Sequence, residues 1–180
     1  MNSRTQHIDA LMDREMIRDC LYRYCRGIDR CDEAMLRSAC WPGGTDDHGA
    51  YNGTTDGFID WAMQTLPIIE RGIHQIHNIL IELRGDEAAV ESYFTALQRQ
   101  PGGEGGLVEL TMAGRYVDRF EKRGDEWRVA DRVVVFDWVD ERPAPEKSEA
   151  ERFAHRKSVG RPWPDDPVYA LFGTETRGEG

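Results

Sequence analysis

The stretch AGRYVDRFEKRGDEWRVADRVVVFDW, residues 113–138, decides the fold of this 180-residue chain. Its two arms are rich in β-branched and aromatic residues, and the Gly124-Asp125 pair between them is typical of a hairpin turn. Apolar side chains recur at every second position of the first arm, which is the period of a strand with one buried face. The stretch therefore predicts two long antiparallel strands, at 107–122 and 127–139.

The residues before this hairpin predict a second one. Residues 76–83, IHNILIEL, alternate in polarity, and 87–98 form another strand after the turn formers Gly85 and Asp86. Strands of this length twist too strongly to stay flat, so we expect the sheet to curl.

Three helices are predicted ahead of the strands. Residues 8–29 carry apolar side chains at steps of three and four, which line one face of a helix. Asp32 is a suitable cap for a second, short helix. Thr55 or Asp56 is expected to cap a third helix, which Pro67 should kink or end.

Between the second and third helices, residues 41–53 hold many turn formers and are predicted to be a loop with a short strand near 47–51. Helices followed by a strand meander indicate an α+β fold, a curved antiparallel sheet wrapped by N-terminal helices around an internal pocket. We place this domain at 1–140. The segment 141–180 is charged and proline-bearing but also holds aromatic residues, so we expect it to pack on the domain or on a neighbouring subunit.

Composition excludes several classes of partner. The net charge of −10 argues against nucleic acid and against anionic membrane surfaces. Neither a signal peptide nor an 18-residue apolar run is present, so a cytoplasmic protein without a membrane span is expected. Four cysteines fall in the first quarter without a CxxC pair, and those in the first helix are expected to be small buried residues.

The only reactive groups that the sequence points to are side chains capable of acid–base catalysis. The sequence has no nucleotide-binding glycine loop, no GxSxG and no convincing metal-ligand spacing, so we expect neither cofactor nor metal. His48, His74 and His77 lie in the middle of the domain, where each is either a functional or a hydrogen-bonded structural histidine. His77 shares strand parity with Ile79, which predicts that it faces the core. Asp29 ends the apolar stripe of the first helix, where a carboxylate is unfavourable without a partner.

Four motifs stand in a characteristic order: GIDRCD (27–32), DDHGAYNG (46–53), IHQIHNILIELRGDEAAVESY (73–93) and the hairpin quoted above. Through them the chain resembles the SnoaL-like family of the nuclear transport factor two-like superfamily, over about residues 20–140. Members include scytalone dehydratase, bile acid dehydratase, hexachlorocyclohexane dehydrochlorinase and formaldehyde lyases acting on lignin-derived aromatic dimers. The resemblance implies a cone-like fold with a pocket inside it and catalysis without cofactor or metal.

The resemblance also implies roles for individual residues. Asp29 matches the acidic residue that pairs with the catalytic histidine, and His74 matches that histidine, with His77 as the rival that strand parity favours. Arg115 and Arg132 match family positions at which we expect structural ion pairs. The residues expected to contact the substrate are Tyr24, Trp41, His48, Tyr51, Trp61, His77 and Phe94.

The function expected from these assignments is that of a lyase. It would eliminate water, halide or formaldehyde from a small apolar, aromatic or polycyclic substrate, with His74 as general base and Asp29 fixing its tautomer. An isomerase or cyclase with the same pair is the nearest alternative. A non-catalytic ligand-binding module, like the small subunits of ring-hydroxylating dioxygenases, is an alternative of a different class.

A homodimer or homotrimer is expected from the last strand. Val133 and Val135 alternate with Val134 and Phe136, so both faces of this strand are apolar. Only one face can meet the pocket and the helices. The other should be covered by a partner subunit or by the C-terminal segment, because large exposed apolar patches are unusual on monomers.

Overall fold

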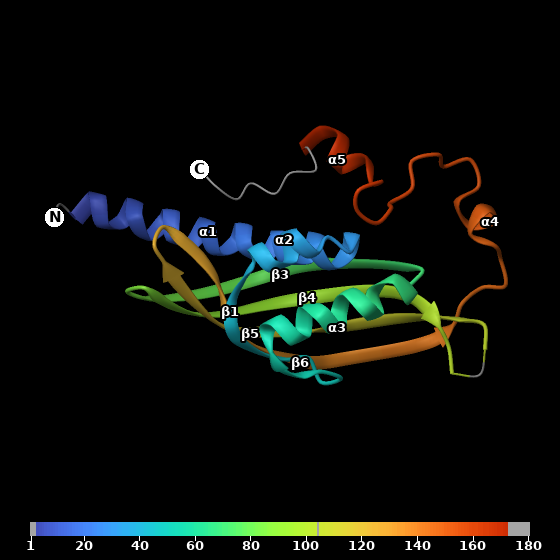
Figure 1. The fold of residues 1–180 in the computed structure, drawn as a ribbon, viewed down its shortest axis with the longest axis horizontal. Helices are drawn as coiled ribbons and strands as arrows, with labels where there is room; N and C mark the ends of the chain where they lie inside the picture. Colours follow the sequence, from blue (N-terminus) through green and yellow to red (C-terminus); the bar gives the residue numbers. More distant parts are fainter. Residues whose placement is uncertain (1–2, 104, 173–180) are drawn as a thin grey trace.

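The computed structural model, which describes residues 3–103 and 105–172, holds one curved six-stranded sheet with helices packed along it (Figure 1). The helices are α1 (Ser3–Arg30), α2 (Glu33–Ser38), α3 (Thr55–Thr65), the 3-10 helix η1 (Leu66–Ile68), α4 (Glu149–Phe153) and α5 (Pro167–Phe172). The strands are β1 (Cys40–Asp47), β2 (Asn52–Thr54), β3 (Arg71–Arg84), β4 (Glu87–Pro101), β5 (Leu107–Arg123) and β6 (Glu126–Pro143). Within these described residues, no helix is both long and apolar enough to cross a membrane.

The strands lie in the order β2-β1-β6-β5-β4-β3. Strands β3 to β6 form the antiparallel meander that the sequence predicts, with β5 and β6 joined at the hairpin of the opening stretch. Strand β1 pairs in parallel with β6 and antiparallel with β2. The predicted α+β class and the curved sheet are confirmed, with one parallel pairing that the sequence did not predict.

Helix α1 extends beyond its predicted range of 8–29 at both ends. The residues of its apolar stripe that are buried against the sheet are Ile17, Leu21, Tyr24 and Ile28. Gly27 sits where α2 crosses α1, and a β-carbon at this position would lie 2.8 Å from Leu36. Glycine therefore allows the two helices their close approach.

Side-chain caps begin the two shorter helices. Asp32 caps α2 as predicted, accepting a hydrogen bond from the Met35 backbone N–H at 3.0 Å. Helix α3 begins one residue earlier than predicted, because Thr54 is its cap and accepts from the Gly57 N–H at 3.2 Å. Pro67 lies in η1, which follows α3 directly, so the α-helix ends before the proline as expected.

The prediction of a loop at 41–53 is wrong for most of that segment. It forms β1 and β2, and the turn between them is closed by the His48 N–H, which donates to the Tyr51 carbonyl at 2.8 Å. Strand β1 is stabilised by pairing with β6, which local composition does not reveal. Gly44 also permits close contact with β6, since a β-carbon there would lie 1.9 Å from the Ala130 oxygen.

The prediction that His77 faces the core is also wrong. The pairing of β3 with β4 shifts between Ile76 and Ile79, so a β-bulge changes which side chains point inward. His74 and Ile76 lie on the inner face before the bulge, whereas His77 is exposed and its Nε2 lies 2.9 Å from the Thr95 hydroxyl.

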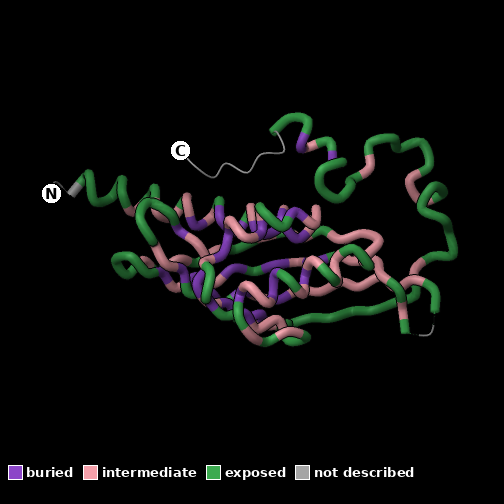
Figure 2. Tube along the Cα trace, viewed as in Figure 1, coloured by how far each residue is buried: buried purple, intermediate pink, exposed green. Residues whose placement is uncertain are grey.

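The core lies between the helices and the inner face of the sheet, where the buried positions gather (Figure 2). It contains one ion pair, in which Arg132 donates to both oxygens of Asp118 at 2.8 and 2.7 Å with both side chains fully buried. Arg115 pairs instead with Asp137 and Glu91 on the outer face. Both arginines form the structural ion pairs that were expected.

The C-terminal segment leaves the sheet after Pro143 and returns over α1 (Figure 1). Arg71, at the start of β3, donates to the Gly160 carbonyl at 2.7 Å, and the Trp163 N–H donates to the Arg30 carbonyl at 2.6 Å. Tyr169 donates to Asp32 at 2.7 Å. These contacts dock residues 144–172, called here the extension, on the same chain. The domain boundary at 140 stays a prediction, and residues 173–180 lie outside the described part.

The outer face of the sheet keeps its apolar residues exposed. Val117 and Val133 are direct partners on β5 and β6, and each is nearly half exposed, while Trp138 is 66% exposed. The contacts of the extension described above lie on α1 and at the start of β3. The outer face therefore remains available to a second copy of the chain.

We expect light scattering to give a dimer or trimer of the 20.6 kDa chain at micromolar concentration. Val117→Lys with Val133→Lys should shift the population to monomer, because two buried charges would oppose the contact. Leu11→Lys, an equally drastic change on exposed α1, is the control and should leave the mass unchanged. A clean monomer of the unaltered protein would contradict the expectation.

Candidate active site

Asp29 and His74 form a hydrogen-bonded pair between the end of α1 and the start of β3. Asp29 Oδ1 lies 2.7 Å from His74 Nδ1, and Asp29 Oδ2 accepts the His74 backbone N–H at 3.0 Å. Their side chains are only 9% and 10% exposed. With the Nδ1 proton in this hydrogen bond, His74 Nε2 carries the lone pair, and it has no hydrogen-bond partner among the described residues.

His74 borders a cavity of about 490 Å³ enclosed by α1, α3 and the inner face of β4 to β6, called here the inner cavity. Its wall is mainly apolar, and its apolar residues include Phe58, Trp61, Phe94, Met112, Val134 and Phe136. The polar side chains on the wall are those of Tyr24, His48, Thr65, His74, Gln98, Gln100 and Tyr116. A mostly apolar cavity with a few polar groups is the usual form of a small-molecule site.

A second histidine–carboxylate pair borders the same cavity. His48 Nδ1 lies 2.6 Å from Oδ1 of Asp46, which is 3% exposed, and its Nε2 lies 3.4 Å from the Tyr24 hydroxyl. The His48 ring stacks on Phe58 with centroids 4.4 Å apart. The position of this ring is therefore fixed by a hydrogen bond on one side and by stacking on its face.

A buried ion pair and a buried phenol lie beneath the cavity. Burial alone would lower the pKa of Arg132, but the charge and hydrogen bonds of Asp118 raise it above its usual value, so the guanidinium stays charged. Asp46 and Asp118 are both buried, and Arg132 donates its hydrogen bonds to Asp118. Burial raises the pKa of Tyr24 well above its usual value, so this phenol keeps its proton.

Of the residues expected at the site, the structure brings together Asp29 and His74 and places Tyr24, His48, Trp61 and Phe94 on the cavity wall. Three others lie elsewhere. Trp41 donates from its indole N–H to the Glu121 carbonyl and packs under two arginines, Arg123 and Arg128, because the bend of β1 turns it away from the cavity. Tyr51 donates to the Thr54 carbonyl and packs behind Phe58 and Trp61, and His77 points outward at the bulge.

Asp46 was missed as a site residue by the sequence reasoning. An Asp-x-His sequence in a strand places both side chains on one face, which would have paired Asp46 with His48. That pattern was not used because the segment was predicted to be a loop. Gln98 and Met112 were missed as well, since their position on the wall depends on how far β4 and β5 curve.

A metal site is not visible in the described parts of the chain, where no three His, Cys, Asp or Glu side chains are grouped as ligands. The cysteines are free and do not resemble activated nucleophiles. Burial raises the pKa of Cys20 to about 11 and that of Cys25 to about 12. The arrangement therefore offers two histidines and two phenols, those of Tyr24 and Tyr116, around an apolar space.

The sequence matches the SnoaL-like domain family over residues 9–133. The chain belongs to this family. No curated protein matches the chain.

Solved structures share the fold of this SnoaL-like protein at low sequence identity. A hexachlorocyclohexane dehydrochlorinase of type 2 is 21% identical with a TM-score of 0.69, covering 79% of this chain and 97% of its own. A scytalone dehydratase-like protein from Novosphingobium aromaticivorans is 18% identical with a TM-score of 0.64, covering 78% and 97%. The beta subunit assigned to an aromatic-ring-hydroxylating dioxygenase of the same organism is 17% identical with a TM-score of 0.56, covering 73% and 93%. These likenesses show the cone fold and leave the activity open.

We expect the thiols to react in an order set by burial and pKa. Cys31 is partly exposed, although burial raises its pKa, and should be alkylated slowly by iodoacetamide at pH 8. Cys20, Cys25 and Cys40 are buried with raised pKa values and should react only after unfolding. Peptide mass spectrometry over time reads this order, with urea-unfolded protein as the control. Early alkylation of Cys20 would contradict the packing of α1.

Proposed function

We propose that this protein is a cofactor-independent lyase acting on a small, mostly apolar, aromatic or polycyclic substrate. The observation that carries the proposal is the Asp29–His74 pair, 2.7 Å apart and bordering an apolar cavity of about 490 Å³. A base with an orienting carboxylate and an unpartnered Nε2 is suited to take a proton from a bound molecule. The dehydrochlorinase and dehydratase-like proteins that share the fold add support for an elimination.

In the proposed reaction, His74 Nε2 takes a proton from a carbon next to the one that bears the leaving group. For loss of water or halide, the electron pair of the broken C–H bond forms the new double bond, and the leaving group departs with the pair of its own bond. For loss of formaldehyde, His74 Nε2 instead takes the O–H proton of a hydroxymethyl group. The O–H pair then forms the carbonyl bond of formaldehyde, and the pair of the broken C–C bond stays on the remaining substrate carbon, which takes up a proton. Asp29 holds the ring in the tautomer that exposes the Nε2 lone pair and balances the imidazolium once it forms. The apolar wall limits water in the site, which strengthens both effects.

The leaving group is proposed to meet His48 and Tyr24, which lie on the wall of the same cavity. His48, backed by Asp46, is proposed to give a proton from Nε2 to a departing oxygen, while Tyr24 donates a hydrogen bond to the same atom. Loss of water needs such a proton, whereas halide leaves without one. In loss of formaldehyde, the proton goes instead to the substrate carbon at which the C–C bond was broken. The proton that His74 gains then returns to His48 through solvent, which restores the resting state.

An isomerase or cyclase with the same base is the second candidate. Tyr24 is the observation that favours an isomerase or cyclase, because a phenol that keeps its proton can stabilise an enolate oxygen by hydrogen bonding. A non-catalytic binding module fits less well, since it does not account for two histidine–carboxylate pairs at one cavity. Product analysis separates the first two, because only an elimination releases a second molecule.

Substrates can be sought by thermal shift with aromatic and steroid-like alcohols, halides and hydroxymethyl compounds. Compounds that raise Tm are then incubated with the protein and analysed by mass spectrometry. Loss of water, hydrogen halide or formaldehyde supports the lyase. Binding without turnover by every compound that raises Tm would favour the non-catalytic module.

For any substrate so identified, His74→Ala should lower kcat by about 100- to 10,000-fold, the usual contribution of a general base. Asp29→Asn should cost less, since the base remains but loses its orienting anion. His77→Ala is the matched control and should retain full turnover, because its side chain is exposed on the outer face. Turnover that survives His74→Ala but fails with His77→Ala would reverse the assignment of the base.

The proton donor is tested with two substrates that differ only in the leaving group. His48→Asn should slow loss of water by about 100-fold or more and leave loss of chloride nearly unchanged, because chloride needs no proton. Asp46→Asn should show the same selectivity with a smaller effect. Equal losses for both leaving groups would mean that His48 positions the substrate and does not protonate it.

A further inference from the structure

A second chamber of about 580 Å³ lies outside the inner cavity, between the mouth of the sheet and the extension, and is called here the outer chamber. The two spaces share the wall residues Ile28, Leu66, Ile69, His74, Gln98 and Leu110. The extension contributes Phe153 and the segment 160–162 to the outer chamber. The two spaces therefore adjoin, with His74 in the lining of both.

The charge of the outer chamber is opposite to that of the whole protein. Five arginines line it against three carboxylates, although the chain carries a net charge of −10. The arginines are Arg30, Arg71, Arg99, Arg142 and Arg161. Such a local excess of one sign in a concave space concentrates ligands of the other sign.

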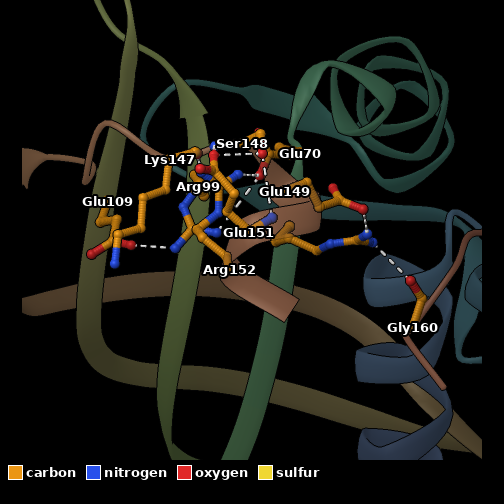
Figure 3. Close-up of polar contacts among 10 residues, drawn as sticks. Glu70, Arg99, Glu109, Lys147, Ser148, Glu149, Glu151, Arg152 and Gly160 are labelled. Atoms are coloured by element: carbon orange, nitrogen blue, oxygen red, sulfur yellow. Dashed lines mark hydrogen bonds and ion pairs between the residues drawn. The ribbon is translucent and has the colours of Figure 1, made fainter. Parts of the chain in front are cut away.

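Three of these arginines are already paired within the chain. Arg99 donates to Glu109 (Figure 3). Arg71 donates to Glu149 at 2.5 Å. Arg30 pairs with Asp166 of the extension at 3.3 Å. Their charges are balanced locally and mainly hold the extension in place.

The guanidinium groups of Arg142 and Arg161 make no hydrogen bond or ion pair to any residue in the described part of the chain. Both are exposed, one at the end of β6 and the other in the extension, and both line the outer chamber. The pKa of Glu109 is lowered by the hydrogen bond from Arg99 and further by the charge of Arg142, which agrees with a positive local potential.

The inner cavity offers no comparable site for an anion. Its lining contains no lysine or arginine, and Arg132 lies fully buried beneath it, held by Asp118 between the rings of Tyr24 and Tyr116. The two histidines on its wall are already held by carboxylates, so an ionised group would lose its hydration there without gaining a lysine or arginine partner. A charged end of a substrate would therefore have to remain in the outer chamber.

We propose that the outer chamber binds a carboxylate group of the substrate through Arg142 and Arg161, while the apolar body of the same molecule lies in the inner cavity against His74. The substrate class is thus an amphipathic acid with a ring at one end. The proposal deepens the proposed function and rests on it for the reaction, but not for the binding.

The test uses 5-phenylpentanoate and its neutral amide, measured by calorimetry on the full-length protein. We expect the acid to bind about tenfold more tightly than the amide at low salt, and salt to weaken only the acid. Arg142→Gln with Arg161→Gln should reduce the preference to about threefold or less. Arg161→Gln alone should reduce the preference for the acid by part of this amount. Because Arg161 lies in the extension, this variant leaves the sheet unaltered.

Arg84→Gln is the matched control, since it removes the same charge at the opposite end of β3 and should keep the full preference. Equal binding of acid and amide by the unaltered protein would overturn the proposal, as would a preference that survives in a folded double variant. Because no turnover is measured, loss of the lyase proposal would leave this result standing. An absent anion preference would likewise leave the lyase proposal open.

Discussion

The buried ion pair between Arg132 and Asp118 is the contact on which the arrangement of the site depends. It joins β5 to β6, and the Arg132 guanidinium lies 4.0 Å from the ring centre of Tyr24 on α1 and 4.1 Å from that of Tyr116. A charge held in the sheet thus fixes the helix above it through cation–π contacts. Breaking such a pair leaves an uncompensated buried charge, at a cost of about 3–5 kcal/mol. Asp29 follows Tyr24 on the same helix, so its distance to His74 depends on that contact.

Local patterns were sufficient for the helices and for the meander, because their apolar periods are long and their turns are marked by Gly-Asp pairs. They failed at β1, whose sequence is rich in turn formers and which exists through its pairing with β6. They failed again at His77, where a single bulge reverses the faces of a strand without leaving a mark in composition. Both errors concern pairing between distant segments, which a single sequence does not encode locally.

The residues of the candidate site also divide into those that sequence reasoning identified and those that depend on pairing between distant segments. Asp29 and His74 were chosen from a family resemblance, and no periodicity would have joined residues 45 positions apart. Asp46 was not identified because β1 was predicted to be a loop, although its spacing to His48 is informative once a strand is assumed. Trp41 was expected on the cavity wall. Its ring instead stacks with Arg123 and Arg128, so aromatic character alone did not identify a ligand contact.

The lack of arginine in the lining of the inner cavity and the group of arginines around the outer chamber both follow from where the chain places these residues. Arg132 is buried against two aromatic rings, those of Tyr24 and Tyr116, and its charge is balanced by Asp118. The guanidinium therefore does not contact a ligand. The extension then brings Arg161 to the mouth, where β6 already ends near Arg142. A molecule that entered through the outer chamber would meet the arginines first and the apolar walls afterwards, with His74 in the lining of both spaces. In the proposed function, a base at that boundary would act on the part of a substrate where the polar and apolar halves join.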